Sequence, residues 1–198
     1  MALRHILLPA LTSLSVTSAL ASDASPPRSM RLDAKKDVAT ASDADAPVLA
    51  TLVQTHTGEH LVLDESAPTQ TRFDALLADR VTGETLALDA RLLGMLRELG
   101  RMHPRARIEI VSGFRSAKLN EMLRKKGHHV ASHSQHSLGH AVDFRVVPEG
   151  ADAALSPLEI ERELRADLHW EGGVGVYLSD SDWFTHADVG PNRRWNGL

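Results

Sequence analysis

The chain has 198 residues and a formal net charge of −4, which suits one domain with a proper core and is too short for two full domains with linkers. The basic residues form no long run, so we do not expect nucleic acid as a partner. There is no cysteine, so the fold is held without disulfides and any metal must be bound by His, Asp or Glu.

The first 21 residues have the pattern of an export signal. Arg4 precedes an apolar stretch, and Ala19-Leu20-Ala21 is a small-x-small cleavage pattern. The apolar stretch is shorter than the roughly 20 residues of a spanning helix, although an uncleaved membrane anchor stays an alternative. We expect cleavage after Ala21, which gives a periplasmic protein without a membrane span in its mature form.

Residues 22–47 combine Ser, Ala, Asp, Pro and charged side chains with almost no large apolar ones. Such a segment cannot bury enough surface to offset the entropy lost on ordering, so it is expected to be a flexible linker. The chain therefore divides into a signal peptide (1–21), a linker (22–47) and one domain (48–198).

The first half of the domain has signals for strands and then for helices. Residues 48–63 form two strand-like runs around Thr57-Gly58, which indicates a hairpin with His56 and His60 on its surface. A short helix is expected over 73–77 and a turn at 82–83. Asp89 is a good N-cap for a helix through His103, because apolar residues follow at helical spacing. These expected core residues are Leu92, Leu93, Leu96, Leu99 and Met102.

The second half has mostly strands after helices, with three short strands separated by turns. Residues 107–111 alternate polar and apolar side chains as in a strand, and Ser116 can cap a helix over 117–126. Ser156-Pro157-Leu158-Glu159 is a capping box that opens a helix to Leu168. Further strands are expected over 140–147, 173–178 and 183–189. This order favours an α+β domain with a small, mainly antiparallel sheet flanked by helices.

Two histidines and an aspartate can converge on this sheet. His136 lies at the mouth of the strand over 140–147, and Asp143 lies on that strand. On the strand over 183–189, alternation puts His186 on the same face as Phe184 and Asp188. If the two strands are neighbours, His136, Asp143 and His186 meet on one surface. Three such ligands with an open fourth position are typical of catalytic zinc.

Simpler interpretations of these residues exist. His136 and His140 stand four apart, as in a helical zinc pair, but Gly139 between them and the alternating run that follows argue against a helix. His128, His129 and His133 fit solvated loop positions. Asp143 alone could be a strand aspartate bonded to a turn. No Cys nucleophile, G-x-S-x-G elbow or S-x-x-K motif supports another catalytic scheme.

The motifs together resemble a known family. S112-G-F-R-S116, Asn120, S134-x-H136-x-x-G139-x-A141-x-D143 and H186-x-D188-x-G190 are similar to the D-Ala-D-Ala metallopeptidase family, which shares its fold and zinc site with hedgehog and lysostaphin-type proteins. T55-H-T-G-E59, D89-x-R-L-L93 and R193-R-W195 extend the resemblance to the YcbK-like murein endopeptidases. It covers about Val48 to Trp195.

The resemblance implies a function and a fold. It implies a hedgehog-like zinc metallopeptidase domain in which His136, Asp143 and His186 bind Zn2+ and a water completes the site. Members of the family cleave peptide bonds in peptidoglycan, and the YcbK-like group is associated with cross-links between meso-diaminopimelate residues. The expected partner is therefore peptidoglycan, and we expect a monomer.

The resemblance leaves the other catalytic residues open. Arg115 matches a family arginine near the scissile bond, where it would hold a carbonyl oxygen or a substrate carboxylate, although a structural pairing with an acidic neighbour is the alternative. Ser134 would brace the loop. The carboxypeptidase members carry a glutamate three residues before the last histidine, where this chain has Trp183. The remaining candidates for the general base are Asp188, Asp182, His133 and His169.

Three functions are compatible with these residues. The first is a zinc-dependent murein endopeptidase. The second is a carboxypeptidase that trims the terminal D-alanine, which would need a cleft closed at one end. The third is a peptidoglycan-binding module without activity, because the usual glutamate is absent. A purely structural metal has less support, since a closed site would need a fourth evident ligand.

Overall fold

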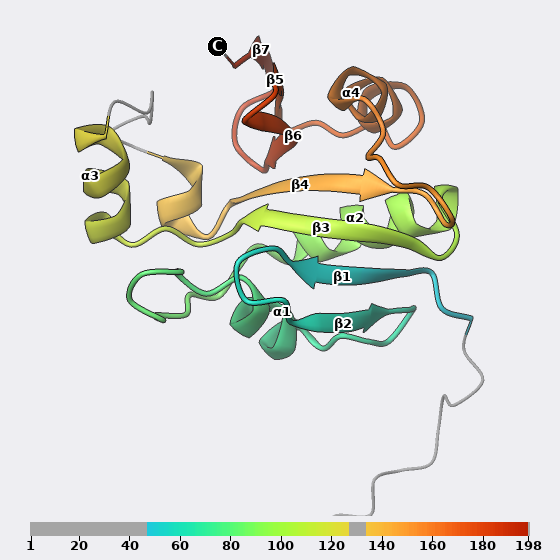
Figure 1. Cartoon of the computed structure of the whole chain (residues 1–198), viewed down its shortest axis with the longest axis horizontal. Helices are drawn as coiled ribbons and strands as arrows, with labels where there is room; N and C mark the ends of the chain where they lie inside the picture. Colours follow the sequence, from blue (N-terminus) through green and yellow to red (C-terminus); the bar gives the residue numbers. More distant parts are fainter. Residues whose placement is uncertain (1–46, 127–133, 198) are drawn as a thin grey trace, which may run out of the picture. The chain divides into compact units, whose positions relative to one another are not determined.

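The computed structural model describes residues 47–126 and 134–197 (Figure 1). The expected signal peptide, nearly all of the expected linker, and His128, His129 and His133 lie outside these residues. In the described part of the chain, no helix is long and apolar enough to cross a membrane.

A seven-stranded mixed sheet forms the centre of the domain, in the order β2-β1-β3-β4-β6-β5-β7. The β1–β3 and β5–β7 pairs are parallel and the other four pairs are antiparallel. The α+β class and the mainly antiparallel pairing are confirmed, but the sheet is larger than expected because the last strand was not predicted. The strands are β1 (Ala50–Gln54), β2 (His60–Leu63), β3 (Ala106–Ser112), β4 (Ala141–Val147), β5 (Gly173–Ser179), β6 (Asp182–Asp188) and β7 (Arg193–Asn196).

Within residues 47–126 and 134–197, four α-helices and one short 3-10 helix accompany the sheet. Each α-helix begins after a Ser, Thr or Asp whose side chain accepts a hydrogen bond from a backbone N–H of the first turn, as expected for N-caps. Asp89, Ser116 and Ser156 act as the predicted caps. The helices are α1 (Gln70–Leu76), α2 (Ala90–Met102), α3 (Ala117–Lys125), η1 (Gln135–Leu138) and α4 (Pro157–Ala166).

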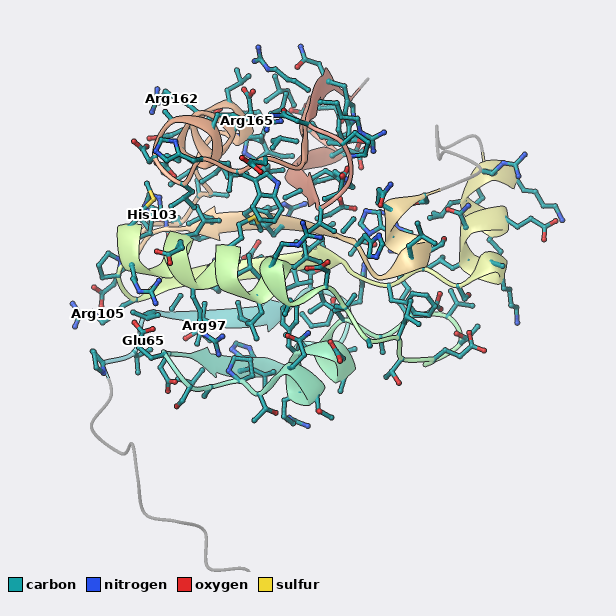
Figure 2. All side chains as sticks on the ribbon, turned by 180° about the vertical axis from the view of Figure 1, so that it is seen from behind. Glu65, Arg97, His103, Arg105, Arg162 and Arg165 are labelled. Atoms are coloured by element: carbon teal, nitrogen blue, oxygen red, sulfur yellow. The ribbon has the colours of Figure 1, made fainter. Side chains whose placement is uncertain are left out.

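The hydrophobic core lies between the sheet and the helices α2 and α4, which cover the same face (Figure 2). Alternate residues of β4, such as Phe144, point into this core, where the apolar stripes of both helices pack. Figure 2 shows His103 at the end of α2 on the side of α4, where its Nε2 lies 2.8 Å from Glu163 Oε2. The predicted core position Met102 is wrong: it is 36 % exposed, because α2 ends there.

The short helix η1 and the helix α3 lie at the end of the sheet where β3 ends and β4 begins (Figure 1). The β3–β4 register shifts between Ile110 and Ser112, so that Ser112 lies opposite Asp143. This β-bulge redirects the chain as it leaves β3. The segment 113–116 then runs over the face that carries Asp143.

Backbone contacts fix the segment 113–116. The Phe114 N–H donates to Leu77 O, and Ser116 N–H donates to the buried carboxylate of Asp79 at 2.6 Å. Gly113 lies against Leu77 so closely that a Cβ there would come within 2.5 Å of Leu77 Cβ. A side chain at this position would therefore displace the whole segment.

We predict that Gly113→Ala destabilises the protein by about 1–3 kcal/mol, because overpacking forces the backbone apart. Gly94→Ala is the matched control, since a Cβ at Gly94 in α2 meets no atom within 4 Å. Because alanine favours a helix over glycine by up to about 1 kcal/mol, the control should be slightly stabilised. Urea unfolding measures both. Equal stability of the two variants would contradict the close contact.

Candidate metal centre

Three buried side chains from three elements meet on the face of the sheet opposite α2 and α4. His136 comes from η1, Asp143 from β4 and His186 from β6, and each offers a donor atom within 4.8 Å of the others. β4 and β6 are neighbours, and their register pairs Asp143 with His186. The condition for convergence that the sequence left open, that these two strands are neighbours, is therefore met, and the three side chains lie together.

The donor atoms form a triangle. His136 Nε2 lies 3.2 Å from Asp143 Oδ1 and 3.2 Å from His186 Nδ1, and His186 Nδ1 lies 2.8 Å from Asp143 Oδ1. Ligands about 2.0–2.1 Å from a tetrahedral zinc ion are about 3.3 Å from one another. The triangle has nearly these edges, so the donor set fits a tetrahedral divalent ion with one position left open.

Hydrogen bonds on the far side of each imidazole fix which nitrogen faces the triangle. His136 Nδ1 lies 2.8 Å from the carbonyl oxygen of Gly113, which can only accept, so Nδ1 carries the proton. His186 Nε2 donates in the same way to Asp188 Oδ2 at 3.0 Å. In the neutral rings, the lone pairs of His136 Nε2 and His186 Nδ1 then face each other and Asp143. The two lone pairs and the carboxylate oxygen repel one another unless a positive charge lies between them.

The pKa values in the metal-free chain follow from the same contacts. Burial, reinforced by the charge of Arg115, lowers the pKa of His136 to about 4, which keeps this ring neutral. Burial also lowers the pKa of His186, but hydrogen bonds to Asp143 and Asp188 outweigh it and raise the pKa above its ordinary value. Burial raises the pKa of Asp143, but His136 and Arg115 hold it well below its usual range. A proton on His186 and a metal ion compete for one lone pair.

Arg115 holds the other oxygen of the central carboxylate. Its guanidinium donates to Asp143 Oδ2 and, through Nε, to Ser112 Oγ at 2.9 Å. The Arg115 side chain is only 14 % exposed. Because Oδ2 is engaged by Arg115, Oδ1 is the oxygen that faces the two imidazoles. The sequence left open whether Arg115 contacts substrate or an acidic neighbour, and in this structure it contacts the neighbour.

Asp188 lies behind His186 and is fully buried. It accepts hydrogen bonds from His186, from Arg193 at 3.0 Å and from the backbone N–H groups of Gly173 and Gly190. Burial raises its pKa, but the bonds from His186 and Arg193 outweigh burial and lower the pKa to about 2. These four donors occupy its lone pairs, on the side of His186 away from the triangle.

The candidates that lie within the described residues are not brought to the triangle. Asp182 lies four residues before His186 on β6, about 13 Å away, and accepts from Ser181. His169 is exposed in the segment after α4. Trp183 lies on the opposite face of β6 from His186 by strand alternation. His140 lies 3.3 Å from Gln135 Oε1 through its Nδ1 and contributes no donor atom to the triangle.

Two aromatic residues beside the site were not predicted. Trp195 on β7 has its ring centroid 5.0 Å from that of His186, and its Nε1 donates to the hydroxyl of Tyr177 on β5. Gly175 gives the signal that was available in the sequence, because a glycine inside a strand often marks the close approach of another segment. A Cβ at Gly175 would come within 2.5 Å of the Trp195 ring.

Comparisons with known proteins agree on one family. The family Peptidase_M15_2, described as Peptidoglycan L,D-endopeptidase MepK, matches residues 44–195. A Haemophilus influenzae protein named probable peptidoglycan L,D-endopeptidase MepK is 34% identical over 131 residues, which span 64% of this chain and 64% of that protein. The peptidoglycan L,D-endopeptidase MepK of Escherichia coli strain K12 is 32% identical over 161 residues, 75% of this chain and 80% of that protein. No solved structure matches the chain.

We predict that zinc stabilises the metal-free protein. A ligand at one hundred times its Kd contributes about 2.7 kcal/mol, which raises the Tm of a chain of this length by about 5–10 °C. His136→Ala should lose this shift, because it removes one of the three donor atoms. His140→Ala is the matched control and should keep the shift. Differential scanning fluorimetry with and without zinc measures this change in Tm. A full shift in His136→Ala would exclude this donor set.

Proposed function

Because the chain belongs to the Peptidase_M15_2 family of peptidoglycan L,D-endopeptidases, we propose that it hydrolyses peptide cross-links of peptidoglycan as a zinc-dependent murein endopeptidase. The observation that carries this proposal is the donor triangle of His136, Asp143 and His186. Two fixed imidazole lone pairs and one carboxylate oxygen, with a fourth position open, are the ligand set of a hydrolytic zinc rather than of a closed structural site.

His136 Nε2, Asp143 Oδ1 and His186 Nδ1 would hold the zinc ion. When bound, zinc supplies a Lewis acid and a water whose pKa is about 7. The protein orients the two imidazole ligands. The carbonyl oxygen of Gly113 fixes the His136 ring, and Asp188 fixes the His186 ring. Ligands held by such outer hydrogen bonds do not have to be ordered when the ion binds.

Arg115 acts on the metal centre indirectly, by orienting Asp143 and balancing its charge. Its bond to Oδ2 keeps Oδ1 directed at the imidazoles and balances the charge of a carboxylate that is 2 % exposed. A lone buried carboxylate would take up a proton instead and would be a poor ligand. The contact with Ser112, made possible by the bulge in β3, fixes the plane of the guanidinium.

Asp188 acts as the orienting group of His186 and not as the general base. A general base must lie within hydrogen-bond reach of the attacking water and have a free lone pair. Asp188 lies behind the His186 ring, and its oxygens already accept from four donors. A carboxylate that accepts the second N–H of a ligand histidine raises the basicity of that ligand.

The same proposal covers the location and the finer fold class. Residues 1–21 act as a signal peptide and 22–47 as a tether, since the substrate lies outside the cytoplasm and Ala19-Leu20-Ala21 fits a cleavage site. Residues 48–198 form the zinc metallopeptidase domain, of the hedgehog type. The mature protein acts in the periplasm as a monomer, and its site needs no second copy, since one chain supplies all three donor atoms.

We predict that the purified protein splits cross-linked muropeptide dimers into monomers, as followed by mass spectrometry. A chelator and His186→Ala should each abolish the reaction, and zinc should restore it only in the wild type. Asp182→Asn is the control that should remain active, because Asp182 lies far along β6. Loss of terminal D-alanine without splitting of dimers would indicate a carboxypeptidase. If the protein binds zinc and leaves every substrate intact, it is a binding module.

We predict that Asp188→Asn weakens zinc binding by about 10- to 100-fold, as loss of an outer-shell carboxylate does elsewhere. Competition with a chromophoric chelator measures the affinity. The orienting role predicts that activity recovers at saturating zinc to within about tenfold. An Asp188→Asn protein that binds zinc normally and is inactive at saturation would instead identify Asp188 as the general base.

A further inference from the structure

An aromatic frame borders the candidate metal centre on the side of β5 and β7. It consists of Tyr177, Phe184 and Trp195. The rings of Tyr177 and Phe184 stack with centroids 4.4 Å apart and planes 17° apart, and the Trp195 ring lies 5.0 Å from that of His186. The frame is therefore continuous from Phe184 through Tyr177 and Trp195 to a donor of the triangle.

The strand register puts Tyr177 on the face that carries the triangle. Gly175 lies opposite His186 on β6 and opposite Trp195 on β7. Tyr177 follows Gly175 by two residues, so its side chain leaves the sheet on the same face as His186 and Asp143. Because Gly175 has no side chain, the Trp195 ring lies over it and contacts both the His186 ring and the Tyr177 hydroxyl.

The contacts of Tyr177 hold its hydroxyl in one place. The ring is fixed by Phe184 on one face and by Gly197, where any Cβ would overlap the ring. Trp195 Nε1 donates to the Tyr177 oxygen at 3.3 Å, and an indole N–H can only donate. The phenolic proton is therefore left to be donated, and among the described residues it has no acceptor.

The phenol remains protonated at neutral pH. Burial raises its pKa, and the charge of Asp143 adds to the rise. The hydroxyl is thus a neutral hydrogen-bond donor on the face of the sheet that carries the candidate centre, next to the Trp195 ring that contacts His186. Arg115, the residue that the family resemblance would put near the scissile carbonyl, is engaged with Asp143 and Ser112 instead.

We infer that Tyr177 is a further catalytic residue, whose hydroxyl donates a hydrogen bond to the scissile carbonyl oxygen as that oxygen becomes negatively charged. The inference rests on the proposed function. The water gives one proton to solvent as its oxygen bonds to the carbonyl carbon. The π electron pair moves onto the carbonyl oxygen, and the phenol stabilises this oxygen without giving up its own proton. The pair returns when the C–N bond breaks, and the leaving amine takes up a proton from solvent.

A hydrogen-bond donor that is held rigidly before the reaction stabilises the transition state much more than a mobile donor does, because it need not reorganise as charge develops. Removal of one such donor from an oxyanion site typically lowers kcat by about 10²–10³-fold. Tyr177 is held by a ring stack, a backbone contact and an indole N–H. It is also the only tyrosine in the chain, so its loss cannot be compensated by another phenol.

The test is Tyr177→Phe in the full zinc-loaded protein with cross-linked muropeptide dimers. The variant keeps the stack on Phe184 and loses one oxygen atom. We expect kcat to fall by about 100-fold or more while KM stays within about threefold, and zinc content and Tm to match the wild type. A phosphinate analogue of the scissile bond, measured by calorimetry, should bind more weakly by a similar factor.

Ser179→Ala is the matched control, since it removes a hydroxyl from the same strand and face, two residues further on, where the oxygen accepts from Asp182 N–H. It should leave kcat and analogue binding unchanged. If the wild type cleaves dimers and Tyr177→Phe cleaves them equally well, the inference fails and the proposed function stands. It also fails if Tyr177→Phe loses zinc or stability, which would indicate a structural role. An inactive wild type would refute the proposed function itself.

Discussion

The buried carboxylate of Asp143 is the constraint on which the rest of the structure depends. A charge out of contact with water must be balanced by partners, and here the partners come from separate parts of the chain. Arg115 arrives from the segment after β3, His136 from η1 and His186 from β6. Each of these segments is tied to one oxygen or the other of the same carboxylate. The position of the donors is therefore set by charge balance as much as by strand pairing.

Much of the fold could be predicted because local signals are strong. Helical spacing in α2, the caps Asp89 and Ser116, and strand alternation in β4 and β6 each depend on a few adjacent residues. Alternation also gave the face of its own strand on which each of Asp143 and His186 lies, but their meeting depended on the pairing of β4 with β6. The last strand, β7, could not be predicted, because four residues rich in arginine carry no alternation and pair only with β5 far back in the chain.

The finer chemistry of the site depends on contacts that spacing does not encode. Strand alternation put Asp188 beside His186, but it could not tell which nitrogen of the ring Asp188 would meet, and that choice separates an orienting group from a base. Likewise, the bulge between Ile110 and Ser112 has no clear signature in the sequence, yet it aims Arg115 at Asp143. Both features are set by long-range pairing.

The two outer strands of the sheet, β2 and β7, have four residues each. An exposed edge strand offers unpaired N–H and C=O groups to any extended chain that comes near, and a short edge offers few. A protein that acts on peptidoglycan is surrounded by peptide chains. Short edges limit unwanted strand addition, and the seven-residue strands β3, β4, β5 and β6 at the centre of the sheet each have a neighbouring strand on both sides.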